Sequence, residues 1–145
     1  MLDGTNPFVR FRNVQKSYDG ETLVVKNLNL DIEAGEFVTM LGPSGSGKTT
    51  CLMMLAGFET ATHGEIELAG RPINNIPPHK RGIGMVFQNY ALFPHMTVSE
   101  NLSFPLKVRG MSSGDIRDKV TRALDMVQMQ AFGDRKPAQL SGGQQ

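Results

Sequence analysis

The sequence has little of what a secreted, membrane-spanning or nucleic-acid-coating protein needs. It holds one cysteine, Cys51, so no internal disulfide can form, which suits a reducing compartment. No apolar run approaches the roughly 18 residues of a membrane span, and residues 1–7 are too short and polar for a signal peptide. The formal net charge of +1 provides no broad basic field for nucleic acid or an anionic membrane. We therefore expect a cytosolic protein, or one peripheral on a cytosolic membrane face.

Metal-ligand clusters and repeats are missing as well. The three histidines, His63, His79 and His95, lack the spacing of a metal-ligand set. No internal repeat or low-complexity segment is present. With 145 residues and 39% hydrophobic content, the chain can bury one modest core, so a single globular domain is expected.

The most informative stretch is Gly42-Pro43-Ser44-Gly45-Ser46-Gly47-Lys48-Thr49, which matches the G-x-x-x-x-G-K-[ST] phosphate-binding loop. It lies between an apolar run and a helix-like run, as the motif requires. Its glycines allow consecutive N–H groups to turn inward as an anion nest at a helix N-terminus. We expect the Lys48 ammonium to reach the β and γ phosphates of a nucleotide and the Thr49 hydroxyl to bind Mg²⁺. The predicted nucleotide-binding residues of this loop run from Gly42 through Thr50. The alternative is a glycine-rich turn that caps an ordinary helix.

The segment before the loop has a strand-like pattern. Residues 8–32 read as an antiparallel pair joined at Asp19-Gly20, a strong hairpin signal. Residues 37–41 read as a buried strand, and the helix after the loop, residues 49–56, is expected to end at Gly57.

Two further strands and two helices are expected after that. Residues 65–69 read as a short strand and residues 82–87 as another buried one. A helix is expected to begin at Thr97 with the capping partner Glu100; Pro105 should disturb it and Gly110 end it. The next helix begins at Ser112 with capping partner Asp115, and its apolar stripe predicts a packing face of Ile116, Val120, Ala123, Leu124 and Val127.

A second motif, Leu140-Ser141-Gly142-Gly143-Gln144, lies at the far end. By itself it could be a polar turn leading into a helix capped by Ser141. Together with the phosphate loop it resembles the signature sequence of the ABC transporter ATPases. The resemblance implies an α/β fold: a P-loop NTPase (ABC ATPase) core with an antiparallel β subdomain and a helical subdomain. Residues 1–89 would form the β flank and P-loop core, residues 90–140 the helical subdomain, and residues 140–145 the signature.

The resemblance also implies roles for residues outside the loop. Tyr18 stands where the family places an aromatic ring for adenine stacking; packing at the strand end is the alternative. Gln88 would bind Mg²⁺ or hold the attacking water, unless it is an ordinary surface glutamine. The signature residues would meet the γ-phosphate of ATP held by a second copy, in a head-to-tail dimer. They are Ser141, Gly142, Gly143 and Gln144.

Subfamily features resemble bacterial importers. Residues 88–98 look like the ATPases of import systems fed by a periplasmic solute-binding protein, and residues 56–60 and 135–140 look like the spermidine and putrescine branch. Sulfate, iron and sugar importers share much of this pattern. Residues 90–110 resemble the surface that meets the transmembrane permease, where Phe93 and Met96 could supply apolar contacts or pack in the core. The implied location is peripheral, on the cytoplasmic face of the inner membrane, with no nucleic acid partner.

The hydrolytic residues of the family have no counterpart before Gln145. The acidic (Walker B) strand, the catalytic glutamate and the switch histidine are expected beyond it, so no catalytic residue is predicted within the chain. We expect ATPase activity in the complete protein and negligible turnover by these 145 residues alone. Parallel strands beside residues 37–41 should also lie outside, leaving apolar surface exposed. Two alternatives stay open: a soluble ABC ATPase acting on nucleic acid or ribosomes, and a module that holds nucleotide without turnover.

Overall fold

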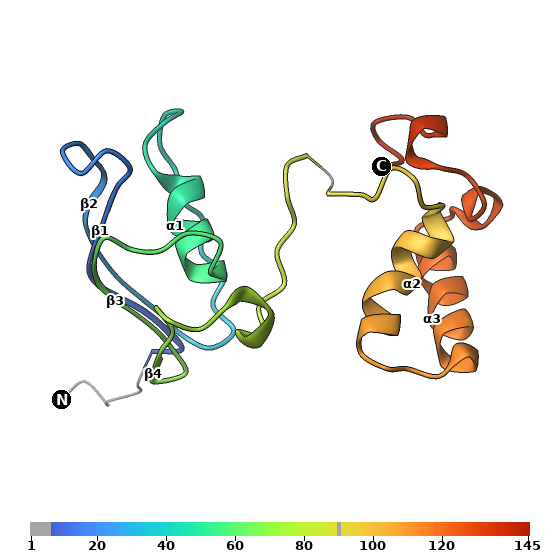
Figure 1. Ribbon diagram of the computed structural model, residues 1–145, viewed down its shortest axis with the longest axis horizontal. Helices are drawn as coiled ribbons and strands as arrows, with labels where there is room; N and C mark the ends of the chain where they lie inside the picture. The colour runs from blue at the N-terminus through green and yellow to red at the C-terminus, as the bar shows by residue number, and fades with distance from the viewer. Residues whose placement is uncertain (1–6, 90) are drawn as a thin grey trace. The chain divides into compact units, whose positions relative to one another are not determined.

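The computed structural model describes residues 7–89 and 91–145. Most of the polar N-terminal segment and Tyr90, within the predicted permease-facing stretch, lie outside the described residues. The chain divides into two compact units that meet in sequence between Met85 and Val86, and each is described by itself (Figure 1).

The first unit is built on a four-stranded antiparallel sheet in the order β2-β1-β3-β4 (Figure 1). Its strands are β1 (Val9–Ser17), β2 (Leu23–Ile32), β3 (His63–Leu68) and β4 (Arg71–Pro72). The predicted hairpin is confirmed, because β1 and β2 pair in antiparallel fashion on either side of the Asp19-Gly20 turn. The predicted short strand is β3, displaced by two residues toward the N-terminus at its start.

A bulge in β1 changes which residues face the core. Val9 and Phe11 are buried, and then Val14 and Lys16 are, so the alternation shifts by one residue between them. The pairing register with both neighbouring strands shifts in the same place, and Asn13 takes a left-handed backbone with φ of 48°. An extra residue in one strand has this effect on a ladder. The bulge is what turns the Lys16 side chain inward.

Helix α1 (Lys48–Ala56) packs against the sheet and completes the core of this unit. Met54 of the helix, Ile66 of β3 and Val14 of β1 are fully buried. Burying a side chain of this size stabilises the fold by about 1.5–3 kcal/mol. The helix ends as predicted at Gly57, whose φ of 88° lets its N–H bond back to the carbonyls of Met53 and Met54.

Arg81 fastens the far end of α1 to the segment that follows β4. Its guanidinium is buried and donates to the carbonyl oxygens of Met54 (2.7 Å) and Leu55 (2.9 Å), both in the last turn of the helix. It also donates to the carbonyl of Ile76 at 2.6 Å, just before the short 3-10 helix η1 (Pro78–Lys80). Burial lowers the pKa of Arg81 from its ordinary value. A cation at this end also opposes the negative pole of the helix.

Two of the expected strands are absent from the structure. Residues 37–41 and 82–87 belong to none of the strands in the part of the chain described, so these two predictions are wrong. Phe37 is 93% exposed, Leu41 89% and Val86 98%. An apolar run indicates a tendency to be buried, but a strand also needs a hydrogen-bonding neighbour. Within residues 37–41, Val38 and Met40 still line a small apolar cavity of about 120 Å³ against α1 and the sheet.

The second unit begins with α2 (Val98–Val108). Its start is the predicted one: the Thr97 hydroxyl accepts from the Glu100 N–H at 3.2 Å, and the Glu100 carboxylate accepts from the Thr97 N–H at 2.7 Å. These bonds lower the pKa of Glu100. Pro105 does not end the helix, which continues to Val108. Only the one donor that proline lacks is lost from the ladder.

Helix α3 (Ser113–Met126) pairs with α2, and two short 3-10 helices follow, η2 (Gln130–Phe132) and η3 (Pro137–Gln139). Ser112 caps α3 as predicted, with its hydroxyl accepting from the Asp115 N–H at 3.2 Å. Val120 and Leu124 of the predicted stripe are buried. Val127 is not part of the packing face: it is exposed because the helix has already ended at Met126.

Candidate nucleotide-binding site

The predicted phosphate loop leads directly into α1. Gly47 is the N-cap, with φ of 88°, and no side chain caps the helix. The first backbone bond into the helix runs from the Cys51 N–H to the Gly47 carbonyl at 2.9 Å. In the first turn of a helix the preceding amides have no acceptor one turn earlier, so those of Lys48, Thr49 and Thr50 are available to a ligand. This arrangement is an anion-binding helix N-terminus.

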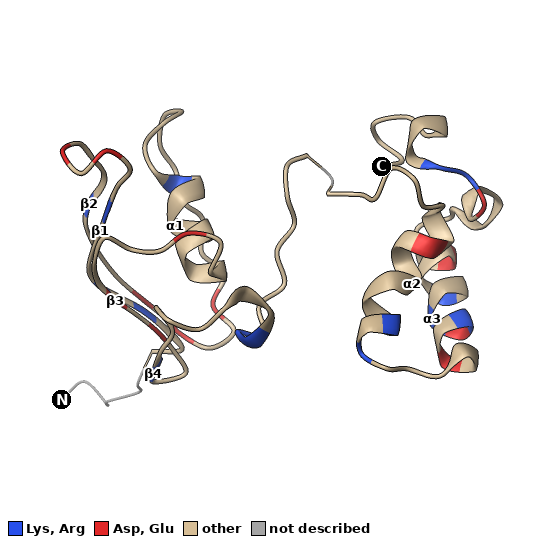
Figure 2. Cartoon of the chain, in the orientation of Figure 1, with Lys and Arg blue, Asp and Glu red and all other residues tan. Residues whose placement is uncertain are grey.

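Lys48 lies across the loop instead of extending away from it. Its Nζ donates to the carbonyl oxygens of Pro43 (2.7 Å) and Gly42 (2.8 Å) and to the Ser46 hydroxyl (3.2 Å). It is the only charged residue of α1, in the first turn of the helix (Figure 2). The amine that the motif assigns to phosphate is therefore already held at the mouth of the loop, where a triphosphate would compete for it.

Gly47 is the loop glycine that the fold cannot replace. A Cβ there would lie 3.0 Å from the Val24 carbonyl oxygen and 3.1 Å from Val25 Cγ2, in β2. Gly45 also has a positive φ, of 80°, but open space around it. The close approach of Gly47 to β2 sets the height of the loop over the sheet.

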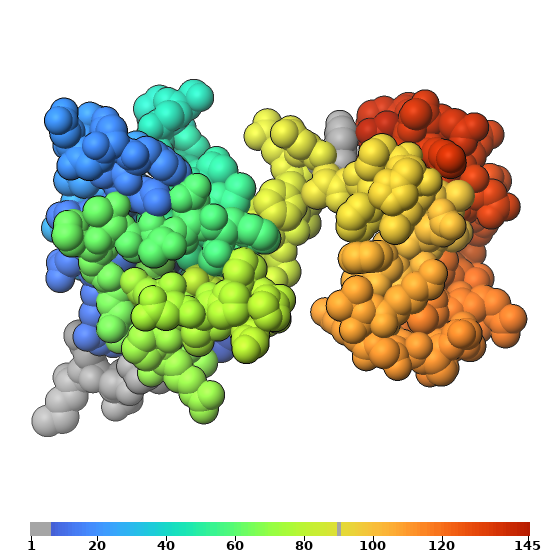
Figure 3. All heavy atoms as spheres, in the orientation of Figure 1, coloured from blue at the N-terminus to red at the C-terminus, as the bar shows by residue number. Residues whose placement is uncertain are grey.

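A groove of about 900 Å³ runs between β2 and the loop. The hairpin and the loop before α1 stand out as two projections with a notch between them (Figure 3). The walls of the groove are Thr22 to Leu28 and Leu30 on one side and, on the other, Val38 to Pro43, Gly45, Ser46, Lys48 and Cys51. Small cavities for ligands commonly measure 300–1,000 Å³. Free amides and a lysine at one end of such a groove fit a nucleotide triphosphate, and the exposed Thr49, next in the chain after Lys48, offers a hydroxyl for Mg²⁺.

Cys51 lines the same groove and is buried. Burial raises the pKa of its thiol from the ordinary value. At neutral pH it is therefore a protonated thiol with weak nucleophilicity.

Tyr18 is placed at the hairpin end of this unit. The residue is 61% exposed, and the Lys16 ammonium lies 4.7 Å from the centroid of its ring. Tyr18 itself does not line the groove, but Thr22, just past the turn, does. Its exposure suits stacking on a base and its contact with Lys16 suits packing at the strand end, so the role of Tyr18 stays a prediction.

Asp19 holds the turn after Tyr18 and was not singled out from the sequence beyond its turn signal. Its carboxylate accepts from the N–H groups of Thr22 (2.7 Å) and Glu21 (2.9 Å) and from the Ser17 hydroxyl (2.9 Å). These bonds, the one from Thr22 first, hold the pKa of Asp19 far below its ordinary value of 3.8.

Gln88 and the signature belong to the second unit, whereas Lys48 and Thr49 belong to the first. Gln88 is exposed and lies in a turn. Among residues 7–89 and 91–145, no three His, Cys, Asp or Glu side chains gather as a metal cluster. Predicted magnesium ligands of the kind offered by Thr49 and Gln88 would not form such a cluster.

The signature residues form a turn and not a helix within the chain. The Ser141 carbonyl accepts from the N–H groups of Gln144 (2.9 Å) and Gln145 (3.1 Å), and the Gln144 side chain accepts from the Ser141 N–H at 3.0 Å. Gly143 has nothing within 4 Å of where a Cβ would stand. The turn describes the conformation of these residues, and their role as a signature stays a prediction.

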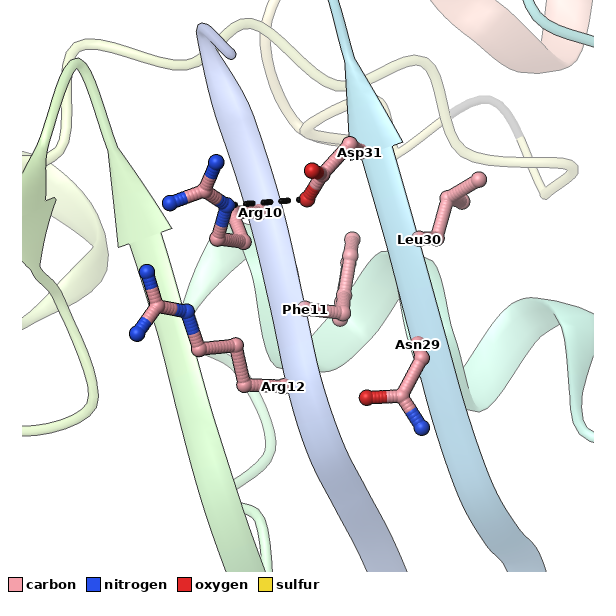
Figure 4. A pocket seen from close by; sticks show the side chains of 6 residues that line it. All are labelled: Arg10, Phe11, Arg12, Asn29, Leu30 and Asp31. Atoms are coloured by element: carbon pink, nitrogen blue, oxygen red, sulfur yellow. Dashed lines mark hydrogen bonds and ion pairs between the residues drawn. The ribbon is translucent and has the colours of Figure 1, made fainter. Parts of the chain in front are cut away.

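A different hollow, of about 430 Å³, lies on the sheet of the first unit and has no phosphate loop near it (Figure 4). It is lined by Arg10, Phe11, Arg12, Asn29, Leu30 and Asp31. Its arginines are occupied: Arg10 Nε bonds to the Asp31 carboxylate at 2.9 Å, and Arg12 lies 3.7 Å from Glu67. This hollow is a paired polar surface of the sheet, so the groove beside Lys48 is the candidate site.

The second unit contains an apolar groove of about 720 Å³. Phe93 and Phe104 line it, with ring centroids 4.7 Å apart, together with residues of α3 and of the C-terminal turn. Charged side chains of both signs are interspersed on α3 (Figure 2). In the part of the chain that the structure describes, no helix has the length and apolar character needed to cross a bilayer.

Comparison with known proteins identifies relatives of the whole chain. A sequence model of the ABC transporter family matches residues 25–145. The spermidine/putrescine import ATP-binding protein PotA of Oleidesulfovibrio alaskensis is 53% identical over 134 residues, which cover 92% of this chain and 36% of that protein. The sn-glycerol-3-phosphate import ATP-binding protein UgpC of Cupriavidus metallidurans is 50% identical over 133 residues, 92% of this chain and 36% of that protein. The chain thus spans about a third of the length of these relatives.

Solved structures agree with the sequence relatives. The ATP-binding cassette MJ0796, in a dimer bound to ADP and Pi, is 38% identical, with a TM-score of 0.84 over 94% of this chain and 64% of that one. A second dimeric structure of MJ0796, described as a bacterial ABC transporter cassette, has the same TM-score at 37% sequence identity. The predicted fold class is thereby confirmed, although the structure lacks two of the expected strands. With the phosphate loop, the groove beside it and these matches together, the chain belongs to the ABC transporter family.

Proposed function

We propose that the chain is the nucleotide-binding part of an ABC importer subunit, which couples MgATP binding and hydrolysis to uptake of a polyamine or a related small solute. The observation that carries this proposal is the Lys48 amine, held by the carbonyl oxygens of Gly42 and Pro43 in the loop before α1, beside a groove of nucleotide size. Relatives named as spermidine/putrescine and glycerol-3-phosphate import ATP-binding proteins support the import role.

In this proposal each part of the site has one task. The amides of the phosphate loop and Lys48 hold the β and γ phosphates, Tyr18 stacks on adenine, and Thr49 with Gln88 binds Mg²⁺. MgATP supplies the phosphoryl group whose transfer to water drives the cycle. The signature residues 141–144 of one copy contact the ATP held by the second copy in a head-to-tail dimer; a dimeric cassette among the structural relatives supports such an assembly.

The partners in the membrane follow from the same proposal. Transmembrane permease subunits bind the second unit, and a periplasmic solute-binding protein delivers the solute, so the subunit is peripheral on the cytoplasmic face of the inner membrane. The apolar groove beside Phe93 supports this role for the second unit. We further propose that these 145 residues, assayed by themselves, bind nucleotide without turning it over.

The experiment is a titration of the chain with ATP and Mg²⁺, in which isothermal calorimetry measures the affinity. We expect Lys48→Ala to weaken the binding of ATP at least tenfold, because a charged hydrogen bond to phosphate is lost. Lys80→Ala, at an exposed lysine of the same unit, is the matched control and should leave the affinity unchanged. Equal affinity of the Lys48→Ala variant and the parent chain would refute the proposal.

The coupling to transport is tested in a cell that depends on uptake of an added polyamine. A full-length subunit carrying Lys48→Ala should fail to restore uptake, whereas one carrying Lys80→Ala should restore it. Restoration of uptake by the Lys48→Ala subunit would contradict the importer role even if ATP binding were confirmed.

A further inference from the structure

Lys16 is a buried lysine beside the predicted base-binding ring. The residue is only 9% exposed, and its ammonium has three neighbours. Nζ donates to the Thr60 carbonyl oxygen at 2.9 Å, forms an ion pair with the Glu59 carboxylate at 2.9 Å, and lies 4.7 Å from the centroid of the Tyr18 ring. The phosphate loop contributes none of these contacts.

The fold fixes this ammonium independently of any ligand. The bulge at Asn13 turns Lys16 toward the inner face of the sheet, and Glu59 and Thr60 follow the C-cap of α1. A buried charge is costly unless it is paired, and here a carboxylate and a carbonyl pair it. The position of the ammonium is therefore fixed, and the ring of Tyr18, the residue after β1, packs against it.

The Tyr18 ring has a cation on one face. The ammonium lies over that face, within the distance at which a cation is attracted to an aromatic ring. The residue is nevertheless 61% exposed, so much of it is accessible to a ligand. A base stacks on an open aromatic face.

We propose that Lys16 is a positioning residue for the base of the bound nucleotide: its ammonium holds the Tyr18 ring from one side, so that the other side receives a purine. This inference rests on the proposed function, since it requires a nucleotide in the groove beside Lys48. It assigns to Lys16 a role in recognition of the base and none in recognition of the phosphates. A lysine that only tied β1 to the segment after α1 would affect both parts of the ligand equally.

The experiment compares two probes, ATP and inorganic tripolyphosphate, which has the phosphates without the base. Binding of each to the intact chain is measured by calorimetry with Mg²⁺. We expect Lys16→Met to weaken the binding of ATP about three- to tenfold, the range of a partly exposed cation–ring contact. The affinity for tripolyphosphate should not change. Lys16→Arg keeps a cation over the ring and should retain the affinity for ATP. Lys80→Met, at an exposed lysine of the same unit that does not line the groove, is the matched control and should change neither.

A double-variant cycle with Tyr18→Ala tests whether Lys16 acts through the ring. The variant carrying both Lys16→Met and Tyr18→Ala should bind ATP no more weakly than Tyr18→Ala alone, because the ring on which Lys16 acts is already gone. Losses that add, or a Lys16→Met variant that weakens both probes equally, would overturn the inference. If Lys16→Met does not fold, Lys16→Gln replaces it, because glutamine keeps a donor for Thr60 without the charge. The same two comparisons then apply: the affinity for ATP against that for tripolyphosphate, and the double variant against Tyr18→Ala alone.

The two proposals fail in different ways. A parent chain that binds neither ATP nor tripolyphosphate contradicts the proposed function. A parent chain that binds both, with an ATP-to-tripolyphosphate ratio that Lys16→Met leaves unchanged, contradicts only the role of Lys16.

Discussion

Lys48 Nζ lies 2.7 Å from the carbonyl oxygen of Pro43, five residues earlier in the chain. The lysine of the phosphate loop thus bonds to the loop that presents it. A triphosphate that enters the groove must replace carbonyl oxygens with phosphate oxygens as partners of this amine. Binding therefore exchanges one set of hydrogen bonds for a stronger, charge-assisted set.

Removal of this amine should loosen the loop in the absence of nucleotide. In Lys48→Met the bonds to Gly42, Pro43 and Ser46 are lost, so we expect faster amide hydrogen exchange across residues 43–47. ATP should slow exchange of residues 47–50 in the parent chain and have little effect in the variant. Exchange that is the same in both chains without ATP would show that Lys48 does not order the loop.

Gly47 and Gly45 should differ in their tolerance of a methyl group. Both have a positive φ, but only a Cβ at Gly47 meets the Val24 carbonyl at 3.0 Å. We expect Gly45→Ala to lower the free energy of unfolding by about 1–2 kcal/mol through backbone strain alone. Gly47→Ala should add about 1–3 kcal/mol from overpacking. Urea unfolding measures both, and equal losses would mean that the loop moves away from β2 without cost.

Arg81 should contribute more to stability than any exposed arginine of the first unit. Arg81→Met leaves the Met54 and Leu55 carbonyls without their side-chain donor, and we expect a loss of about 2–4 kcal/mol. Arg71→Met, at an exposed position in β4, should change the unfolding free energy by no more than about 0.5 kcal/mol. Thermal or urea unfolding followed by circular dichroism provides the comparison. Similar losses in the two variants would contradict the capping role.

Asp19 should make the hairpin sensitive to acid. Its folded pKa is depressed below the ordinary 3.8, so the stability that its ionised form contributes is complete above about pH 4. That contribution is lost as the pH falls from there toward the folded pKa. Asp19→Asn should therefore be less stable than the parent chain at pH 7, and the difference should shrink at pH 3. Urea unfolding at the two pH values is the measurement, and a difference that grows at pH 3 would reverse the assignment.

Local signals in the sequence predicted the local structure well. Thr97 with Glu100, Ser112 with Asp115, and Gly57 set helix ends at the predicted places, because a cap is made by residues within one turn of each other. The Asp19-Gly20 turn was equally readable. The phosphate loop was predicted as a unit, since its spacing alone fixes which amides converge.

Features that depend on distant parts of the chain were not predictable in the same way. The role of Arg81 depends on carbonyls 26 and 27 residues away, and that of Lys16 on a carbonyl 44 residues away. The bulge at Asn13 is a matter of register between strands and leaves no pattern in one strand alone. The expected strands at residues 37–41 and 82–87 failed for the same reason, because pairing requires a neighbour and apolar character does not supply one. The roles of Gln88 and the signature remain predictions, since they join groups from two units.

The guanidinium of Arg81 ties the last turn of α1 to a segment that reaches Gln88 only seven residues later in the chain. A helix is stiff along its axis, and this one has the phosphate loop at its opposite end. We therefore expect a displacement of α1 along its axis, caused by a triphosphate at its first turn, to move Ile76 and Arg81 by a similar distance. The same hydrogen bonds that stabilise the fold thus link the phosphate-binding end of the helix to the segment around Ile76 within the first unit.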